Sequence, residues 1–236
     1  MRFCAALLAL VLAPSAACAD PPPALMLWAW ERPEDLRFLP SNVGVAYLRT
    51  TVAVGPAGVR IAPRRQSLRV RAGAFLMAVV RVEVRPRTVS LTSATRERIV
   101  GALVDAARSP GARAVQIDFD ARASQRGFYR EVLVDARRAL GAGTWLSMTA
   151  LASWCEGDAW LDALPVHEVV PMVFSMGTDG AAVLGALRAR GGFRSAACRT
   201  SVGWAAGEAS TALRGVTRRY VFNAHPWTEA TARAWW

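Results

Sequence analysis

Two aspartates, one residue apart at the end of an apolar stretch, are the side chains of this sequence best suited to chemistry. Residues 114–119 are mostly apolar and predict a β-strand, and Asp118 and Asp120 alternate where it ends. Side chains alternate between faces along a strand, so both carboxyls are expected on one face. Neighbouring carboxylates drive their pKa values apart, which suits acid–base catalysis. The alternative is structural, with one aspartate capping the next helix and the other binding backbone amides.

Other chemically useful side chains lie near the ends of further apolar segments. Glycoside hydrolysis needs two carboxyl groups, one on each side of the scissile bond. The candidates are Glu31, Asp118, Asp120 and Glu208. Tryptophan faces suit stacking on sugar rings, although packing in the core or at its rim is the alternative. The candidate substrate-binding residues are Trp28, Trp30, Thr149, Trp154, Met172, Trp204, Asn223 and Trp227.

Composition excludes several other chemistries. All 29 basic residues are arginine, so Schiff-base catalysis and a lysine-bearing phosphate loop are ruled out. The chain has no Gly-x-Ser-x-Gly nucleophile elbow. His167 and His225 are its two histidines, and neither has the spacing of a metal ligand, so no metal or other cofactor is expected.

The first 19 residues predict a secretory signal peptide. Arg2 precedes an apolar run over residues 3–12, and Ala17-Cys18-Ala19 fits a cleavage site. Residues 20–24 then form a proline-rich tether, and the mature chain is exported to the periplasm or secreted. A short buried helix is one alternative. A second is a lipoprotein anchored through Cys18, although Ser15 departs from the leucine that usually opens that motif.

The elements that position these residues alternate between strand and helix. Strands are expected over residues 25–30, 43–48, 74–84, 114–119, 145–151, 169–174, 200–204 and 219–223. Helices are expected from Pro33, after Thr92 or Ser93, and over 128–140, 158–164, 180–190, 209–214 and 228–236. Residues 51–61 predict a β-hairpin in place of the second helix. This order predicts a compact (β/α)8 TIM-type barrel over residues 25–236, a single domain.

The main competing architecture is an open doubly wound sheet. That fold usually has a glycine-rich first turn, and the segment Trp30-Glu31-Arg32-Pro33 has none. In a barrel, the carboxyl ends of the strands form the functional face. The candidate acids and tryptophans are therefore expected to gather there.

Several segments resemble a bacterial exported family known as domain of unknown function 3142. They are residues 114–120, 128–129, 146–154, 170–177 and 220–223, spread over nearly the whole mature chain. The family has no assigned activity to carry over.

A more distant resemblance is to family 18 glycoside hydrolases, the chitinase-like barrels. Their fourth strand carries Asp-x-x-Asp-x-Asp-x-Glu, whose later aspartates match Asp118 and Asp120, while Val115 takes the first position. The glutamate position, that family's proton donor, holds Arg122. The resemblance implies either that Glu31 or Glu208 replaces this acid, or that the barrel binds glycan without cleaving it.

Charge and cysteines supply the remaining expectations. The net charge is +11, and Arg60, Arg64, Arg65, Arg69 and Arg71 cluster around the hairpin. They are expected either to bind an anionic envelope surface or to be a solvated face of biased composition. Nucleic acid is not expected, because no recognition motif is present. Cys155 follows one strand and Cys198 precedes another, at opposite ends of a barrel, so no disulfide between them is expected.

Together these observations predict an exported, glycoside-hydrolase-like barrel that acts on or binds an envelope or extracellular polysaccharide. The alternative is a non-catalytic glycan-binding protein, or an envelope structural or assembly protein that uses its tryptophans and arginines. Whether the protein is an enzyme stays open at this point, and no transmembrane segment is expected in the mature chain.

Overall fold

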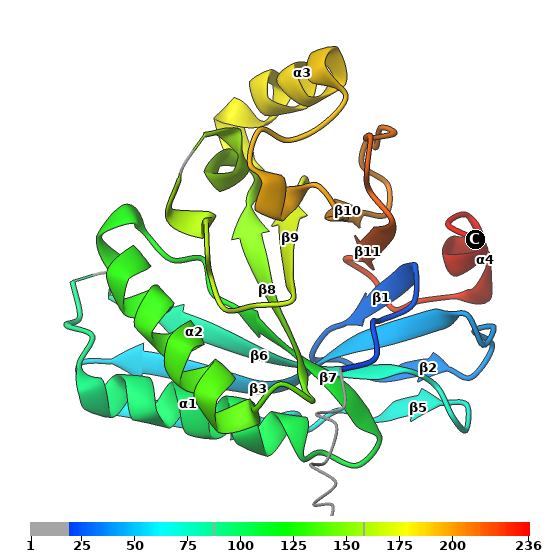
Figure 1. Cartoon of the computed structure of the whole chain (residues 1–236). Helices are drawn as coiled ribbons and strands as arrows, with labels where there is room; N and C mark the ends of the chain where they lie inside the picture. The colour runs from blue at the N-terminus through cyan, green and yellow to red at the C-terminus, as the bar shows by residue number, and fades with distance from the viewer. Residues whose placement is uncertain (1–18, 87, 158) are drawn as a thin grey trace, which may run out of the picture.

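Eight parallel strands close into a barrel, which confirms the predicted fold. The computed structural model describes residues 19–86, 88–157 and 159–236, so all but the last residue of the predicted signal peptide lies outside it. The barrel strands are β1 (Leu25–Ala29), β3 (Val43–Gly55), β6 (Leu76–Val84), β7 (Ala112–Asp118), β8 (Trp145–Leu151), β9 (Glu168–Met172), β10 (Ser201–Ala205) and β11 (Arg218–Phe222). Strand β1 pairs in parallel with both β3 and β11, and this closes the barrel (Figure 1).

The predicted hairpin is present. The distal part of β3 continues past the barrel and pairs antiparallel with β4 (Gly58–Pro63). Gly58, at the turn, has a φ of 103°, a left-handed conformation that favours glycine. The hairpin occupies the place of the helix between the second and third barrel strands.

The helix predicted to begin at Pro33 is absent, and this prediction is wrong. Residues there form β2 (Glu34–Leu36), which pairs in parallel with β5 (Leu68–Val70) as a separate two-stranded sheet. Glu34 is buried, forms an ion pair with Arg32 and accepts a hydrogen bond from the backbone N–H of Trp227. Tertiary contacts of this carboxylate therefore override the local helix-start pattern.

In the part of the chain that the structure describes, four α-helices cover parts of the barrel: α1 (Ser93–Ala107), α2 (Arg126–Leu140), α3 (Gly180–Arg190) and α4 (Glu229–Arg233). Helix α1 begins after Thr92, whose side chain accepts a hydrogen bond from the N–H of Thr95, as expected of an N-cap. Helices α1 and α2 lie side by side on one flank of the barrel (Figure 1). Their buried stripes, including Ile99, Leu103 and Leu133, pack there.

Elsewhere the outer layer is thinner than predicted. Between β8 and β9 lie the short 3-10 turns η2 (Ala152–Glu156) and η3 (Ala159–Leu161). The expected helix over 158–164 is not formed over residues 159–164, and residue 158 lies outside the described residues. Residues 209–214 are not helical either. They are mostly exposed, and a six-residue helix without a buried face is not stable.

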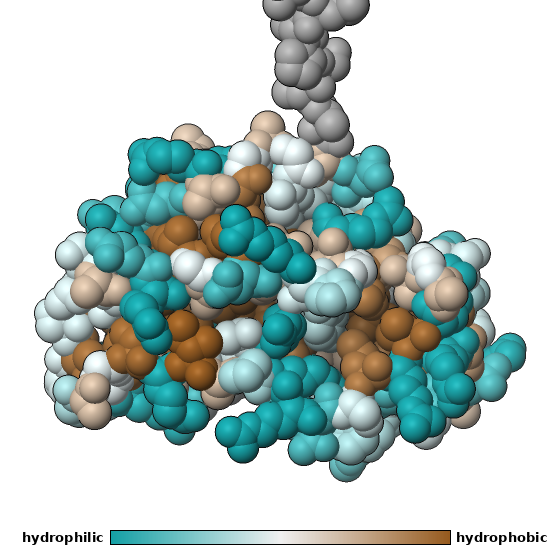
Figure 2. Space-filling view, turned by 90° about the horizontal axis from the view of Figure 1, so that it is seen from below, coloured by the Kyte–Doolittle hydropathy of each residue, from teal (hydrophilic) through white to brown (hydrophobic). Residues whose placement is uncertain are grey.

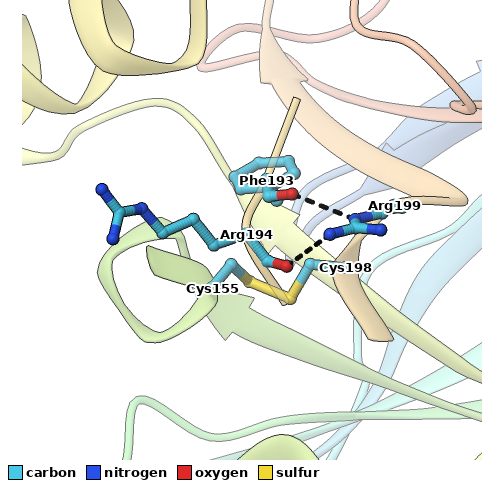
Figure 3. Close-up of a disulfide and its surroundings, with 5 residues drawn as sticks. All are labelled: Cys155, Phe193, Arg194, Cys198 and Arg199. Atoms are coloured by element: carbon cyan, nitrogen blue, oxygen red, sulfur yellow. Dashed lines mark hydrogen bonds between the residues drawn. A yellow bond between two sulfur atoms is a disulfide. The ribbon is translucent and has the colours of Figure 1, made fainter. Parts of the chain in front are cut away.

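A disulfide joins Cys155 to Cys198, which contradicts the expectation that the two would lie far apart (Figure 3). Their Cα atoms are 6.0 Å apart. The expectation placed each cysteine at a strand end, a full strand length from the other. Instead, η2 turns back after β8, while η5 (Ala196–Cys198) packs against β9, which η2 also contacts. The N–H of Ser195 donates to the carbonyl of Cys155 at 3.0 Å, so the two turns meet.

The turn that carries Cys198 is held by the next residue. The guanidinium of Arg199 donates to the carbonyls of Phe193 and Arg194 at 3.1 and 2.7 Å (Figure 3). Both cysteines are completely buried. The disulfide thus joins the connection before β10 to the connection after β8. In the connection after β8, the described residues form 3-10 turns and no α-helix.

Buried polar groups close the amino-terminal end of the barrel. Glu168, at the start of β9, pairs with Arg218 at 2.6 Å and accepts hydrogen bonds from Ser201 and Tyr220. Its side chain is fully buried, so these partners supply the compensation that a buried carboxylate requires. This buried network lies at the end of the barrel opposite to the carboxyl ends of its strands.

The surface seen from below is mostly hydrophilic, with hydrophobic patches between polar side chains (Figure 2). Over residues 19–86, 88–157 and 159–236, no helix is both long enough and apolar enough to cross a bilayer.

Candidate functional site at the carboxyl ends of the strands

A cavity of about 370 Å³ opens at the carboxyl ends of the barrel strands. Its volume lies in the lower part of the range usual for small-molecule sites. Aromatic and sulfur-containing side chains form much of its wall, and polar groups gather around the end of β7. The polar members are Arg81, Gln116, Asp118, Asp120, Thr149, Ser153 and Ser175.

Asp118 lies at the end of β7 and is buried. Its Oδ2 atom is 2.7 Å from Nη1 of Arg81, and its Oδ1 atom accepts a hydrogen bond from the Thr149 hydroxyl at 2.8 Å. Both carboxylate oxygens therefore have protein partners. Asp118 is held in place by these two contacts and in turn positions Arg81 and Thr149.

Arg81, on β6, connects three side chains at the mouth of the barrel. Besides Asp118, it pairs with Glu83 through its Nε atom at 2.9 Å, and its guanidinium lies 5.3 Å from the ring centroid of Trp30. Burial opposes its charge, but the carboxylates of Asp118 and Glu83 outweigh this and raise the pKa of Arg81. The guanidinium thus stays charged and fixes both an acid and an aromatic wall.

Asp120 is in a different environment. It is exposed at the rim of the cavity and makes no hydrogen bond or ion pair with any residue that the structure describes. The surrounding protein still removes part of its water, which raises the pKa of its carboxyl above the usual 3.8, and the charge of Asp118 adds to the rise. Asp120 is therefore the carboxyl that is available to a ligand.

Aromatic rings form a continuous wall on the other side of the cavity. Phe174 and Phe222 stack with centroids 5.6 Å apart, and Trp30 meets Phe222 edge-on at 6.1 Å. Trp28 lies deeper and packs edge-on against Phe174 at 6.0 Å. Trp30, Phe174 and Phe222 are only partly buried, so their rings are accessible from the cavity.

The floor of the cavity is fixed by hydrogen bonds along the barrel axis. The indole N–H of Trp28 donates to Gln116 at 2.9 Å, and the Gln116 amide donates to Ser147 at 3.0 Å. Gly203 provides the room for this arrangement, because a Cβ atom there would lie 2.8 Å from the Trp28 ring. Trp28 is thus locked in one orientation.

A wider, more open groove of about 960 Å³ continues from the cavity. The two hollows share Arg81, Asp120 and Leu151. The groove runs between the end of β6 and the segment after β7, where Arg122 lies. Asp120 consequently stands at the junction of an enclosed pocket and an extended channel.

The structure brings six of the sequence candidates together around the cavity. They are Trp28, Trp30, Asp118, Asp120, Thr149 and Met172. Asp118 and Asp120 both line it, as their alternation on the strand predicts. Glu31 and Glu208 do not: Glu31 accepts hydrogen bonds from the backbone N–H groups of Arg65 and Gln66, and Glu208 accepts one from that of Ser175.

The remaining candidates also lie outside the cavity. Trp154 lines the groove, where it is buried against Trp160 with ring centroids 4.9 Å apart. Trp204 is buried in the outer core, because strand alternation directs it away from the barrel axis. Trp227 is buried and donates to the carbonyl of Trp28, and Asn223 accepts from the N–H of His225. These residues support the rim.

Arg81, Gln116, Phe174 and Phe222 are among the lining residues that the sequence did not single out as candidates. Gln116 precedes Asp118 by two positions on the same strand, so alternation places it on the same face. A search for polar residues in phase along the predicted strands would have found both Gln116 and Arg81.

The five arginines around the hairpin differ in their environments. Arg64 donates to the carbonyls of Trp30, Arg32 and Gln66, and burial lowers the pKa of its guanidinium. Arg71 is partly buried, whereas Arg60, Arg65 and Arg69 are exposed. Arg64 is therefore a structural clamp on the loop after β1.

The described residues contain no group of three or more histidine, cysteine, aspartate or glutamate side chains placed to hold a metal ion. Comparison of the chain with protein-family models, curated proteins and solved structures finds no match.

Proposed function

We propose that this chain is an exported, glycoside-hydrolase-like barrel that binds a polysaccharide of the envelope or extracellular space. The observation that carries the proposal is the cavity at the carboxyl ends of the strands, where accessible aromatic rings face an unpaired carboxylate, Asp120. Export is proposed from the signal-peptide pattern of residues 1–19.

The wall and the rim supply the two kinds of contact that a sugar requires. Trp30, Phe174 and Phe222 offer apolar ring surfaces for the C–H faces of a pyranose. Asp120 and Ser153, on the polar side, offer partners for hydroxyl groups. The adjoining groove gives the rest of a chain a path out of the cavity, which favours a polymer over a free monosaccharide.

Binding is better supported than hydrolysis by an ordinary pair of carboxyl groups. Among the described lining residues, only Asp118 and Asp120 are carboxylic acids, and both oxygens of Asp118 are engaged by Arg81 and Thr149. The residue at the chitinase-like proton-donor position, Arg122, is exposed in the groove. A second free carboxyl on the cavity is therefore missing among the described residues.

One observation supports a catalytic alternative. The raised pKa of Asp120 is a property of general acids in glycosidases, because it keeps a proton on the carboxyl at higher pH. In this alternative Asp120 protonates the leaving oxygen. The nucleophile that attacks the anomeric carbon is then a water molecule or a substituent of the substrate itself.

A glycan array with product analysis tests the proposal. We expect the purified protein to bind a defined set of glycans without releasing products, and Trp30→Ala to abolish binding. Trp236→Ala is the matched control, because Trp236 is exposed and does not line the cavity. Product release that Asp120→Asn abolishes would establish the catalytic alternative. Absence of glycan binding, with salt-sensitive adhesion to anionic lipid, would instead favour an envelope structural or assembly role.

A further inference from the structure

The cavity has a charge balance opposite to that of the whole chain. The protein carries a net charge of +11, yet two carboxylates and one guanidinium line the cavity. The guanidinium, Arg81, is already paired with Asp118 and Glu83. Arg81 attracts Asp120 without forming an ion pair with it, so the cavity keeps a net negative charge at the place where a ligand enters.

The aromatic wall is suited to the same kind of ligand. Ring faces attract cations through the negative charge of their π-systems, most strongly for tryptophan. In this protein a cation already rests on one of these rings, since the guanidinium of Arg81 lies 5.3 Å from the Trp30 centroid. Phe174 and Phe222 present further rings to the cavity.

On these grounds we infer that the cavity selects a sugar bearing a free, positively charged amino group over its neutral and anionic counterparts. The inference rests on the proposed glycan-binding function and specifies its substrate class. The ammonium group lies between Asp120 and the aromatic wall, with Thr149 and Ser153 within the same lining. A carboxylated sugar meets Asp118 and Asp120 without a free cation in the cavity to compensate for them.

The selection applies to the cavity rather than to the whole channel. The charged groups around Asp120 are Asp118 at the end of β7, Arg81 and Glu83 on β6, and Arg85 and Arg122 along the groove. Since Arg85 and Arg122 lie outside the cavity, only the sugar unit inside it needs the amino group. A partly N-acylated polymer therefore fits when a free amine occupies that unit.

Titration of the intrinsic tryptophan fluorescence with glucosamine, glucose and glucuronate tests the inference, because Trp28 and Trp30 line the cavity. A cation–π contact together with a charge pair predicts at least about tenfold tighter binding of glucosamine than of glucose, and weaker binding of glucuronate. Asp120→Asn should remove most of the preference. Asp105→Asn, on the exposed face of α1, is the matched control and should retain it.

The pH and salt dependence provide a second readout. Because the pKa of Asp120 is raised, the preference should disappear as the pH falls through that value, while binding of neutral glucose persists. Salt should weaken glucosamine binding more than glucose binding. Equal affinity for glucosamine and glucose would overturn the inference and leave the proposed function intact. If none of the sugars changes the fluorescence and the glycan array is also negative, the proposed function fails, and the inference fails with it.

Discussion

Replacement of Arg81 by methionine tests whether the mouth of the barrel depends on one guanidinium. Arg81→Met keeps an unbranched apolar side chain against Trp30 but leaves Asp118 without its cation. The Asp118 side chain is only 5% exposed, so its carboxylate cannot recover the lost contact from water. Breaking a buried ion pair costs about 3–5 kcal/mol. Because Arg81 is 29% exposed and Thr149 still donates to Asp118, we expect a loss of about 2–3 kcal/mol.

Urea unfolding followed by tryptophan fluorescence measures this loss, with Arg37→Met as the matched control. Arg37 pairs with Asp35 at 2.6 Å, but their side chains are 60% and 45% exposed, so the control should have little effect. Adding Asp118→Asn to Arg81→Met should recover part of the stability, because it removes the unpaired charge. The reasoning is refuted if Arg81→Met destabilises the protein no more than Arg37→Met does, or if the second substitution makes it worse.

Three further predictions concern the disulfide, the cavity floor and the free carboxyl. Non-reducing peptide mapping should recover a Cys155–Cys198 peptide, and free thiols at both positions would contradict the structure. Replacing both cysteines by serine should lower the free energy of unfolding by up to about 4 kcal/mol, because the disulfide closes a loop with a sequence separation of 43. Gly203→Ala should destabilise the protein by about 1–3 kcal/mol by crowding the cavity floor, whereas Gly101→Ala, in open space on α1, should stabilise it slightly in the same calorimetric measurement. Asp120→Asn should raise the melting temperature at pH 7 but not at pH 3. The raised pKa of Asp120 means that its charged form destabilises the fold, and the carboxyl is charged at pH 7 but protonated at pH 3. A loss of stability at pH 7 would show that this carboxylate has a partner.

Strand alternation accounts for what the sequence predicted well. The barrel strands coincide with the predicted alternating segments, and Asp118, at the end of β7, and Asp120, two residues later, line the same cavity as their spacing predicts. The same rule explains Gln116, which the sequence analysis missed. Periodicity within a strand is thus a reliable guide to which residues share the barrel interior.

Contacts between segments far apart in the chain explain the features that could not be predicted from the sequence. Glu31 follows the first strand directly, as a site residue would, yet its carboxylate binds the backbone N–H groups of Arg65 and Gln66. The disulfide forms because 3-10 turns fold back along β9, a feature without a distinct local pattern. The paths of the loops therefore determine where the Glu31 carboxylate lies and which cysteines meet, and the composition near a strand end does not reveal these paths.

A crystal structure with the glycan that binds most tightly in the array tests the central claim most directly. We expect a sugar ring in the cavity, in contact with Trp30 and Phe222 and within hydrogen-bond distance of Asp120, with the remaining units in the adjoining groove. A glycan bound elsewhere, for example on Arg60 and Arg69 of the hairpin region, with an empty cavity, would contradict it.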